Sequence, residues 1–295
     1  MSDYVISACS TVDTDIKVME QHDIKYLNFH YFIDDVEYVD DLGVSVDYKA
    51  FYNAMRQGAM TKTSQPNAEE YEKYFSQFLD DGKDVLHLTL SSGISGAINS
   101  ANIAADNLRE KYPDRKIYVV DSYAASGGFG LLMVTLSELR DRGMDIDKLH
   151  EYALNNRLRL HHWFFTSDLT YLVRGGRVSK VSGFVGTVLN ICPLLNVDFE
   201  GRLIPRYKIR TKKKVIQETF NRMVEHAENG RDYSGKVYIT QSDCYEDARA
   251  LADMIEEAFP KLSEKVSINY IGPTIGSHTG PGTVALFFWG DERVD

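Results

Sequence analysis

The chain has 295 residues, 43% of them hydrophobic, which is enough to bury a sizeable core in two packed lobes. Its formal net charge of −10 argues against general nucleic-acid binding, because neutralising phosphates requires a basic face. The sequence contains no apolar run long enough to span a bilayer, no signal-peptide pattern at its start and no CxxC pair among its three cysteines. We therefore expect a cytoplasmic protein.

Short apolar strands alternate with amphipathic helices through the first half of the chain. The helix predicted at 67–79 has a capping-box spacing at Asn67 and Glu70, and apolar residues along it form one buried stripe. The other predicted elements are strands at 4–7, 85–90 and 116–121, a helix at 97–111, and helices up to about residue 159. This alternation is typical of a parallel α/β sheet.

The second half of the chain departs from this regular alternation. Two strands at 194–197 and 202–209 flank the turn DFEGR and are expected to pair. The remaining predicted elements are a strand at 163–166, an apolar helix around 184–191, helices at 211–228 and 245–259, and strands at 236–240, 266–271 and 284–289. We place the boundary between the two lobes near residue 160.

Three loops of small residues adjoin these elements: TKTSQP at 61–66, SSGISG at 91–96 and GSHTGPG at 276–282. In α/β sheets, ligands bind beyond the carboxyl ends of the strands. Ser95 is expected near a helix N-terminus, which favours an anion, although simple N-capping by Ser91 or Ser92 explains the same sequence equally well. His278 stands among glycines that allow close approach of a ligand, so we favour a functional role for it.

Several other classes of site are poorly supported. There is no GxxxxGK[ST] or GxGxxG sequence for nucleotide phosphates, and GISGA lacks the GxSxG arrangement of serine hydrolases. His161, His162 and Asp168 lie close in sequence, but adjacent histidines on a strand point to opposite faces, so no metal site is predicted there. The basic run RLIPRYKIRTKKK at 202–214 is either a site for an anionic partner or a solvated strand edge.

Six segments, taken in order, give the sequence a family resemblance. TSQP, SSGISGA, VVDS, YLVRGGRVS, KIRTKKK and GPTIGSHTGPGT together resemble the DegV family of bacterial fatty-acid-binding proteins, which includes the binding subunits of fatty acid kinase. The resemblance implies an α/β fold with a parallel-sheet lobe at 1–160, a mixed-sheet lobe at 161–295 and a long-chain fatty acid between them. One departure is the end of the first strand, SACST, where the family has an Asp-Ser-type turn; Ser10 and Thr11 remain available there.

The resemblance also implies which residues hold the fatty-acid carboxylate. Thr63, Ser95 and His278 match the family's head-group residues, and Arg210 matches an arginine that approaches the same group. A carboxylate only accepts hydrogen bonds, so several converging donors suit it, and charge-assisted bonds are the strongest of these.

Two further roles follow from the same resemblance. Arg174 and Arg177 lie where the family meets the kinase or the membrane surface. The hydrocarbon tail of the fatty acid would need an apolar tunnel. Burying about sixteen of its methylenes would contribute on the order of 13 kcal/mol to binding before the costs of association. Candidates for the wall of the tunnel are four residues that ordinary core packing explains as well: Phe184, Val185, Val188 and Leu189.

The leading hypothesis is therefore a carrier without enzymatic activity, cofactor or metal. It would present a bound fatty acid to a kinase that forms an acyl phosphate for phospholipid synthesis, with ATP and magnesium on the partner. Two alternatives stay open. One is an esterase or acyl-transfer enzyme using His278 and Ser95. The other is a regulatory module that binds a partner through Arg174, Arg177 and the basic run.

Overall fold

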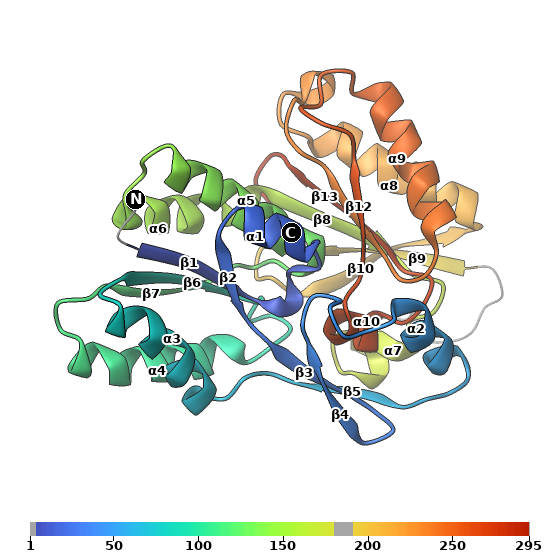
Figure 1. Ribbon diagram of the computed structural model, residues 1–295. Coiled ribbons are helices and arrows are strands. Elements are labelled where there is room, and N and C mark those ends of the chain that lie inside the picture. The colour runs from blue at the N-terminus through green and yellow to red at the C-terminus, as the bar shows by residue number, and fades with distance from the viewer. Residues whose placement is uncertain (1–3, 180–190, 295) are drawn as a thin grey trace.

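Three β-sheets and the helices around them make up an α/β fold (Figure 1). Residues 4–179 and 191–294 are described in the computed structural model. Part of the apolar helix expected around 184–191 therefore lies outside the described residues, as do Phe184, Val185, Val188 and Leu189, and Ile191 belongs to a strand instead. No helix within the described ranges is long and apolar enough to cross a bilayer.

The first sheet is parallel throughout, as the sequence predicts. Its strand order is β2-β1-β6-β7, with bounds Ile24–Leu27, Tyr4–Cys9, Asp84–Thr89 and Ile117–Asp121. Figure 1 shows helices on both faces of this sheet, so its two central strands, β1 and β6, are buried on both sides. The helices are α1 (Ile16–Gln21), α3 (Ala68–Asp80), α4 (Ala97–Lys111), α5 (Ser126–Asp141) and α6 (Ile146–Asn156).

The helix predicted at 67–79 shows why these elements could be read from sequence. Asn67 accepts a hydrogen bond from the backbone N–H of Glu70, and the Glu70 side chain accepts one from the backbone of Asn67, which closes the capping box. Tyr71 and Phe75 are fully buried on the inner face of this helix. Local capping and apolar spacing therefore agree with the tertiary packing.

The second sheet is mixed, with strand order β10-β9-β8-β13-β11-β12. Only β11 and β12 pair in parallel, and the predicted hairpin is formed by β9 and β10. The strands, in that order, span Leu203–Arg210, Ile191–Val197, Leu160–Phe165, Val284–Trp289, Tyr238–Gln241 and Ser267–Tyr270. Helices α8 (Lys212–His226) and α9 (Tyr245–Ala258) pack on this sheet.

Helix α5 joins the two sheets into one continuous core. It contacts β1 of the first sheet and β8, β11 and β13 of the second. Phe129 from this helix belongs to the same buried cluster as Phe164 and Phe287 from the second sheet. The chain enters the second sheet at Leu160, close to the predicted boundary. The division into lobes at 1–160 and 161–295 stays a prediction, because α5 packs against both sheets.

A third, antiparallel sheet was not foreseen. Its order is β4-β3-β5, with bounds Val36–Asp40, Phe29–Ile33 and Thr61–Ser64, and α2 (Tyr48–Arg56) lies between β4 and β5 in the chain. The prediction of a loop at 61–66 is therefore wrong for its first four residues. TKTS has only polar side chains, which do not show a strand's alternation of apolar and polar residues.

The loop predicted at 276–282 is also partly wrong, because Pro273–Thr279 forms helix α10, which includes the first four residues of that segment. Pro273 occupies the first helical turn, where its missing N–H leaves no bond unmade. Ser277 and Thr279 turn their hydroxyls back onto the carbonyls of the preceding turn, and Gly280 ends the helix at φ +74°. The high content of Gly, Ser and Thr concealed this short helix.

The remaining helical segments are short. Helix α7 spans Thr170–Arg174 within YLVRGGRVSK, and 3₁₀ turns lie at Ser10–Val12, Arg157–Arg159 and Gly230–Asp232. Helix α7 packs on α10, which in turn packs on β3 and β5 (Figure 1). Segments that are far apart in sequence thus meet at α10.

Candidate functional site

Two of the predicted head-group residues are in direct contact. Thr63 lies on β5 and His278 near the end of α10, and the Thr63 Oγ1 to His278 Nε2 distance is 2.7 Å. A second bond, from Thr61 Oγ1 to the carbonyl of Ser277 at 3.3 Å, ties the same strand to the same helix. The TSQP and GSHTGPG segments, which are more than 200 residues apart, therefore build one site.

Arg177 completes this contact from the other side of His278. Its Nη1 lies 3.5 Å from His278 Nδ1 and donates to the carbonyl of Gly175 at 2.6 Å. Its Nε donates to the carbonyl of Ile94 at 3.2 Å, which links it to the SSGISG segment. A Cβ on Gly175 would lie 2.3 Å from His278 Nδ1, so only glycine lets the chain pass so close to the imidazole.

The contacts of His278 determine which ring nitrogen carries the proton. An arginine can only donate, so Nδ1 accepts from Arg177, and Nε2 carries the proton and donates to Thr63 Oγ1. The Thr63 hydroxyl then keeps its own proton for another acceptor. Burial, followed by the charges of Arg177 and Arg174, lowers the pKa of His278 to about 3. His278 is therefore neutral at pH 7.

Ser95 lies beside this group and reaches it through Gln65. The Ser95 hydroxyl donates to Gln65 Oε1 at 3.1 Å and accepts from the backbone N–H of Ala97 at 3.2 Å. Gln65 follows Thr63 by two residues and also donates to Ser100 at 3.1 Å. Sequence reasoning missed Gln65, although the quoted TSQP segment contains it next to Thr63.

Simple N-capping does not explain the other serines of SSGISG. The N-cap of α4 is Gly96, which has no side chain, and the N–H of Ala97 at the start of the helix bonds to Ser95 rather than to Ser91 or Ser92. Ser91 instead donates to the carbonyl of Gly201 at 2.7 Å, which holds the loop against the turn of the β9–β10 hairpin.

We call Thr63, Gln65, Ser95, Arg177 and His278 the head-group cluster. Arg177 is partly buried, and its hydrogen-bond partners are two carbonyls and a neutral imidazole. Within residues 4–179 and 191–294, no carboxylate forms an ion pair with it, and burial lowers its pKa. The cluster therefore offers one cation, hydroxyl and amide donors, and no acid. Such a set suits an anion with several acceptor oxygens.

The other predicted arginines make no hydrogen bond or ion pair with the cluster within the described residues, although the charge of Arg174 reaches His278. Arg174 is exposed, stands 5.0 Å above the ring of Tyr171, and its Nη1 is 3.4 Å from Met60 Sδ. Arg210 is the exposed last residue of β10, opposite Ile191, and among the described residues it makes no hydrogen bond or ion pair with the cluster. The predicted head-group role of Arg210 and the predicted partner role of Arg174 and Arg177 remain predictions.

The other segments singled out from sequence have local partners. The Ser10 hydroxyl accepts the backbone N–H of Phe29 at 3.0 Å, and Thr11 is fully buried. Asp168 accepts from the backbone of Thr170, and His162 bonds to the carbonyl of Leu160. In the basic run, Arg202 pairs with Asp198 and Lys212 with Asp247.

Comparisons with known proteins place these features in a family. The model of the DegV family matches residues 5–291. A DegV domain-containing protein from Clostridium perfringens is 38% identical over 293 residues and covers 99% of each chain. A protein from Thermotoga maritima described as a fatty acid-binding protein is 32% identical over 282 residues and covers 94% of each chain.

Solved structures share the fold. The crystal structure of a DegV lipid-binding protein from Thermotoga maritima matches with a TM-score of 0.85 at 29% identity, over 100% of both chains. The Fatty Acid Kinase (Fak) B3 protein of Streptococcus pneumoniae, loaded with linoleic acid, matches with a TM-score of 0.83 at 24% identity, over 99% of this chain and 100% of that one. The two T. maritima proteins are described as a fatty acid-binding protein and a lipid-binding protein.

Proposed function

The chain belongs to the DegV family, and on this premise we propose that it binds one long-chain fatty acid with the carboxylate in the head-group cluster. The observation that carries the proposal is the partly buried Arg177, which has only uncharged partners among the described residues. A buried cation and a buried carboxylate are each unfavourable alone and stabilise one another when paired. The fatty acid is the ligand, and no cofactor is needed.

Each polar member of the cluster has a defined part in this proposal. Thr63 donates the hydroxyl proton that its bond from His278 leaves available. Ser95 donates after its hydroxyl turns from Gln65, and Arg177 supplies the compensating charge. His278 acts mainly by orienting Thr63, because its single N–H already points at that residue. We keep Arg210 as a candidate that would have to reach the carboxylate from β10.

The hydrocarbon tail is proposed to lie in a tunnel between the two lobes, where burying apolar methylenes supplies most of the affinity. Phe184, Val185, Val188 and Leu189 stay candidates for its wall. Support comes from relatives rather than from the described residues, since the T. maritima relatives are described as fatty acid- and lipid-binding proteins.

The bound carboxylate is further proposed to be presented to a fatty acid kinase in the cytoplasm, for acyl-phosphate formation and phospholipid synthesis. The resemblance in sequence to kinase binding subunits supports this role. So does Arg174, because it is exposed to a partner and its charge reaches His278 in the head-group cluster. The same surface is a candidate for transient contact with the membrane.

The alternative of an esterase or acyl-transfer enzyme finds little support in the geometry. A hydrolase histidine takes the proton from its nucleophile and is oriented by an acid on its other nitrogen. Here Nδ1 of His278 faces the guanidinium of Arg177, and Ser95 bonds to Gln65 instead. The binding function fits this arrangement better.

The direct test is to purify the protein, denature it and identify the released molecules by mass spectrometry. We expect a long-chain fatty acid in near-equal amount to the protein. Ser95→Ala should weaken fatty-acid binding about 10-fold to 150-fold, which corresponds to losing one hydrogen bond to a charged group. His278→Ala should also weaken it, because the Thr63 hydroxyl loses the bond that orients it. Absence of any fatty acid, together with unchanged affinity in both variants, would overturn the proposal.

The kinase step has its own test. Arg174→Glu should leave fatty-acid affinity unchanged and slow acyl-phosphate formation when the purified protein is mixed with a fatty acid kinase and ATP. Loss of fatty-acid binding in this variant would instead place Arg174 in the head-group site and remove its assigned partner role.

A further inference from the structure

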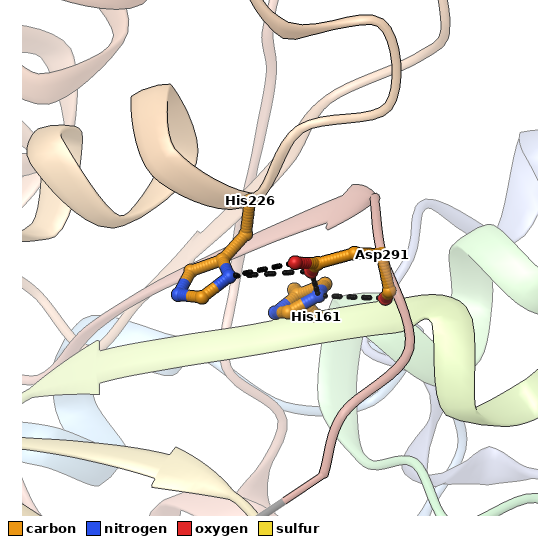
Figure 2. Close-up of side chains that lie close together, drawn as sticks. All are labelled: His161, His226 and Asp291. Carbon is orange, nitrogen blue, oxygen red and sulfur yellow. Dashed lines mark hydrogen bonds and ion pairs between the residues drawn. The ribbon is translucent and has the colours of Figure 1, made fainter.

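A second cluster of polar side chains lies away from the head-group cluster. His161 is near the start of β8, His226 is the last residue of α8, and Asp291 follows β13 (Figure 2). Their ligating atoms all lie within 4.8 Å of one another. Helix α7 and Arg177 follow the other end of β8, so the two clusters lie toward opposite ends of that strand.

One carboxylate oxygen of Asp291 lies between the two imidazoles. Oδ1 is 2.9 Å from His161 Nε2 and 3.2 Å from His226 Nδ1 (Figure 2). The backbone carbonyl of Asp291 is also 3.0 Å from His161 Nε2. In a tetrahedral zinc site with bonds of 2.0–2.2 Å, neighbouring ligand atoms lie about 3.4 Å apart. The two separations between Asp291 and the histidines are slightly shorter than that value, and every pair of ligand atoms lies within 4.8 Å.

The backbone around Asp291 fixes its position over the histidines. The N–H of Asp291 donates to the carbonyl of His226 at 3.0 Å, and the N–H of Glu228 donates to the carbonyl of Trp289 at 3.1 Å. A Cβ on Gly290 would lie 2.2 Å from the His226 carbonyl and 2.8 Å from His161 Cδ2. Glycine at 290 is therefore required for the chain to close over the imidazoles, and this closure places the carboxylate between them.

The two imidazoles differ in exposure, since His161 is buried whereas His226 is partly exposed and also stacks on Trp163, with ring centroids 6.0 Å apart. The His161 ring is buried between the ring of His226, with centroids 4.9 Å apart, and the ring of Phe288, with centroids 5.2 Å apart. The His161 and His226 ring planes differ by 19°. Because nearly parallel rings cannot both aim a lone pair at one ion, the partly exposed His226 ring has to rotate to join His161.

We propose that His161, His226 and Asp291 form a binding site for a divalent transition-metal ion, and that Zn²⁺ is the ion they suit best. Two imidazoles and a carboxylate are ligands of this class, whereas Mg²⁺ and Ca²⁺ prefer all-oxygen sites. Water or the Asp291 carbonyl supplies the fourth ligand. The ion joins β8, α8 and the C-terminal segment, so its role is to stabilise the second sheet.

The test uses tag-free protein that has been stripped of metal with a chelator. Titration with ZnCl₂ in a calorimeter should show one equivalent bound, and the melting temperature should rise with Zn²⁺ but not with MgCl₂. His226→Ala and Asp291→Asn should each weaken Zn²⁺ binding at least tenfold and abolish the rise. Asp291→Asn keeps the size and one acceptor oxygen, so circular dichroism should find it folded.

His30→Ala is the matched control. His30 also contacts two carboxylates, but through opposite ring nitrogens: Nδ1 lies 3.2 Å from Glu37, and Nε2 lies 2.9 Å from Glu70. These two acids cannot share one ion with a single His30 nitrogen, so the control should bind Zn²⁺ like the wild type. No binding by the wild type, wild-type affinity in both cluster variants, or loss of binding in the control would each overturn the proposal.

Discussion

The two ends of helix α10 contact side chains of opposite charge, and we assign them different roles. At its N-terminal end, Asp13 Oδ1 accepts the N–H of Gly272 at 2.9 Å, and Asp40 Oδ2 accepts the N–H of Thr274 at 3.1 Å. Both carboxyls are almost completely buried and suit the positive end of a helix dipole. At the other end, His278 faces the cation of Arg177 and no acid among the described residues.

This difference suggests that the N-terminal end of α10 holds the helix in place and that its C-terminal end takes part in ligand binding. Both oxygens of Asp13 have partners inside the protein, because Oδ2 also accepts from Ser126 at 2.5 Å, whereas Asp40 is bonded through Oδ2 and its Oδ1 has no hydrogen-bond partner among the described residues. The cation at the second end has only uncharged partners in the described chain. A satisfied buried group holds structure in place, whereas a buried charge without a counter-charge points to a ligand. Helix α10 is thus fixed at one end and presents His278 at the other.

The largest expected effect is a loss of stability when Asp13, at the N-terminal end of α10, is replaced. Asp13→Ala leaves the Gly272 N–H and the Ser126 hydroxyl without their acceptor, and it places alanine at a left-handed φ of +44°. We expect a loss of about 2–4 kcal/mol in the free energy of unfolding, measured by urea denaturation. Asp13→Asn keeps an acceptor and tolerates the left-handed backbone, so it should cost much less. Equal losses in both variants would contradict this account of the N-terminal end.

Replacing Arg177 at the C-terminal end of α10 should lower fatty-acid affinity rather than stability. Arg177→Gln removes a charge-assisted bond to the proposed carboxylate, so fatty-acid affinity should fall about 10-fold to 150-fold. Stability of the ligand-free protein should stay the same or rise, because the variant no longer buries an uncompensated cation. Arg174→Gln, at an exposed position, is the control and should change affinity little. A large loss of stability in Arg177→Gln would show that Arg177 is structural.

The sequence predicted most of the two larger sheets but little of what surrounds α10. Strong local signals, such as the capping box at Asn67, found the helices of the first sheet, and six segments in order identified the family. The third sheet escaped because TKTS lacks alternation, and α10 escaped because its turns are made of Gly, Ser and Thr. Local sequence does not encode which distant segments meet.

The head-group cluster shows the same limit at the level of single residues. Thr63 and His278 were named from motifs, and they do touch. The proximity of Arg177 to His278 was missed because it depends on Gly175 allowing helix α7 to approach α10, a tertiary contact with no local signature. Gln65 was missed because the resemblance assigned the carboxylate to hydroxyl groups, whereas Gln65, two residues after Thr63, carries an amide.

The smallest expected effect is on the pH dependence of stability, and it distinguishes the two ends by sign. Burial raises the pKa of Asp40 from 3.8 to about 6, so its contribution is fully present below pH 4 and is lost as the pH rises through 6. The pKa of His278 is lowered from 6.5 to about 3, so its contribution is present above pH 6.5 and is lost as the pH falls through 3.

Between pH 4 and 6 the two groups therefore oppose one another, each by at most about 1.4 kcal/mol per pH unit. Relative to the wild type, Asp40→Asn should make stability rise more steeply with pH over this range, because it removes the contribution that falls. His278→Gln should make the rise less steep. Urea denaturation at half-unit steps measures both slopes, and because the other buried histidines remain in every variant, their titration cancels in the comparison. Slopes that shift in the same direction would show that the two ends of α10 do not carry opposite electrostatic roles.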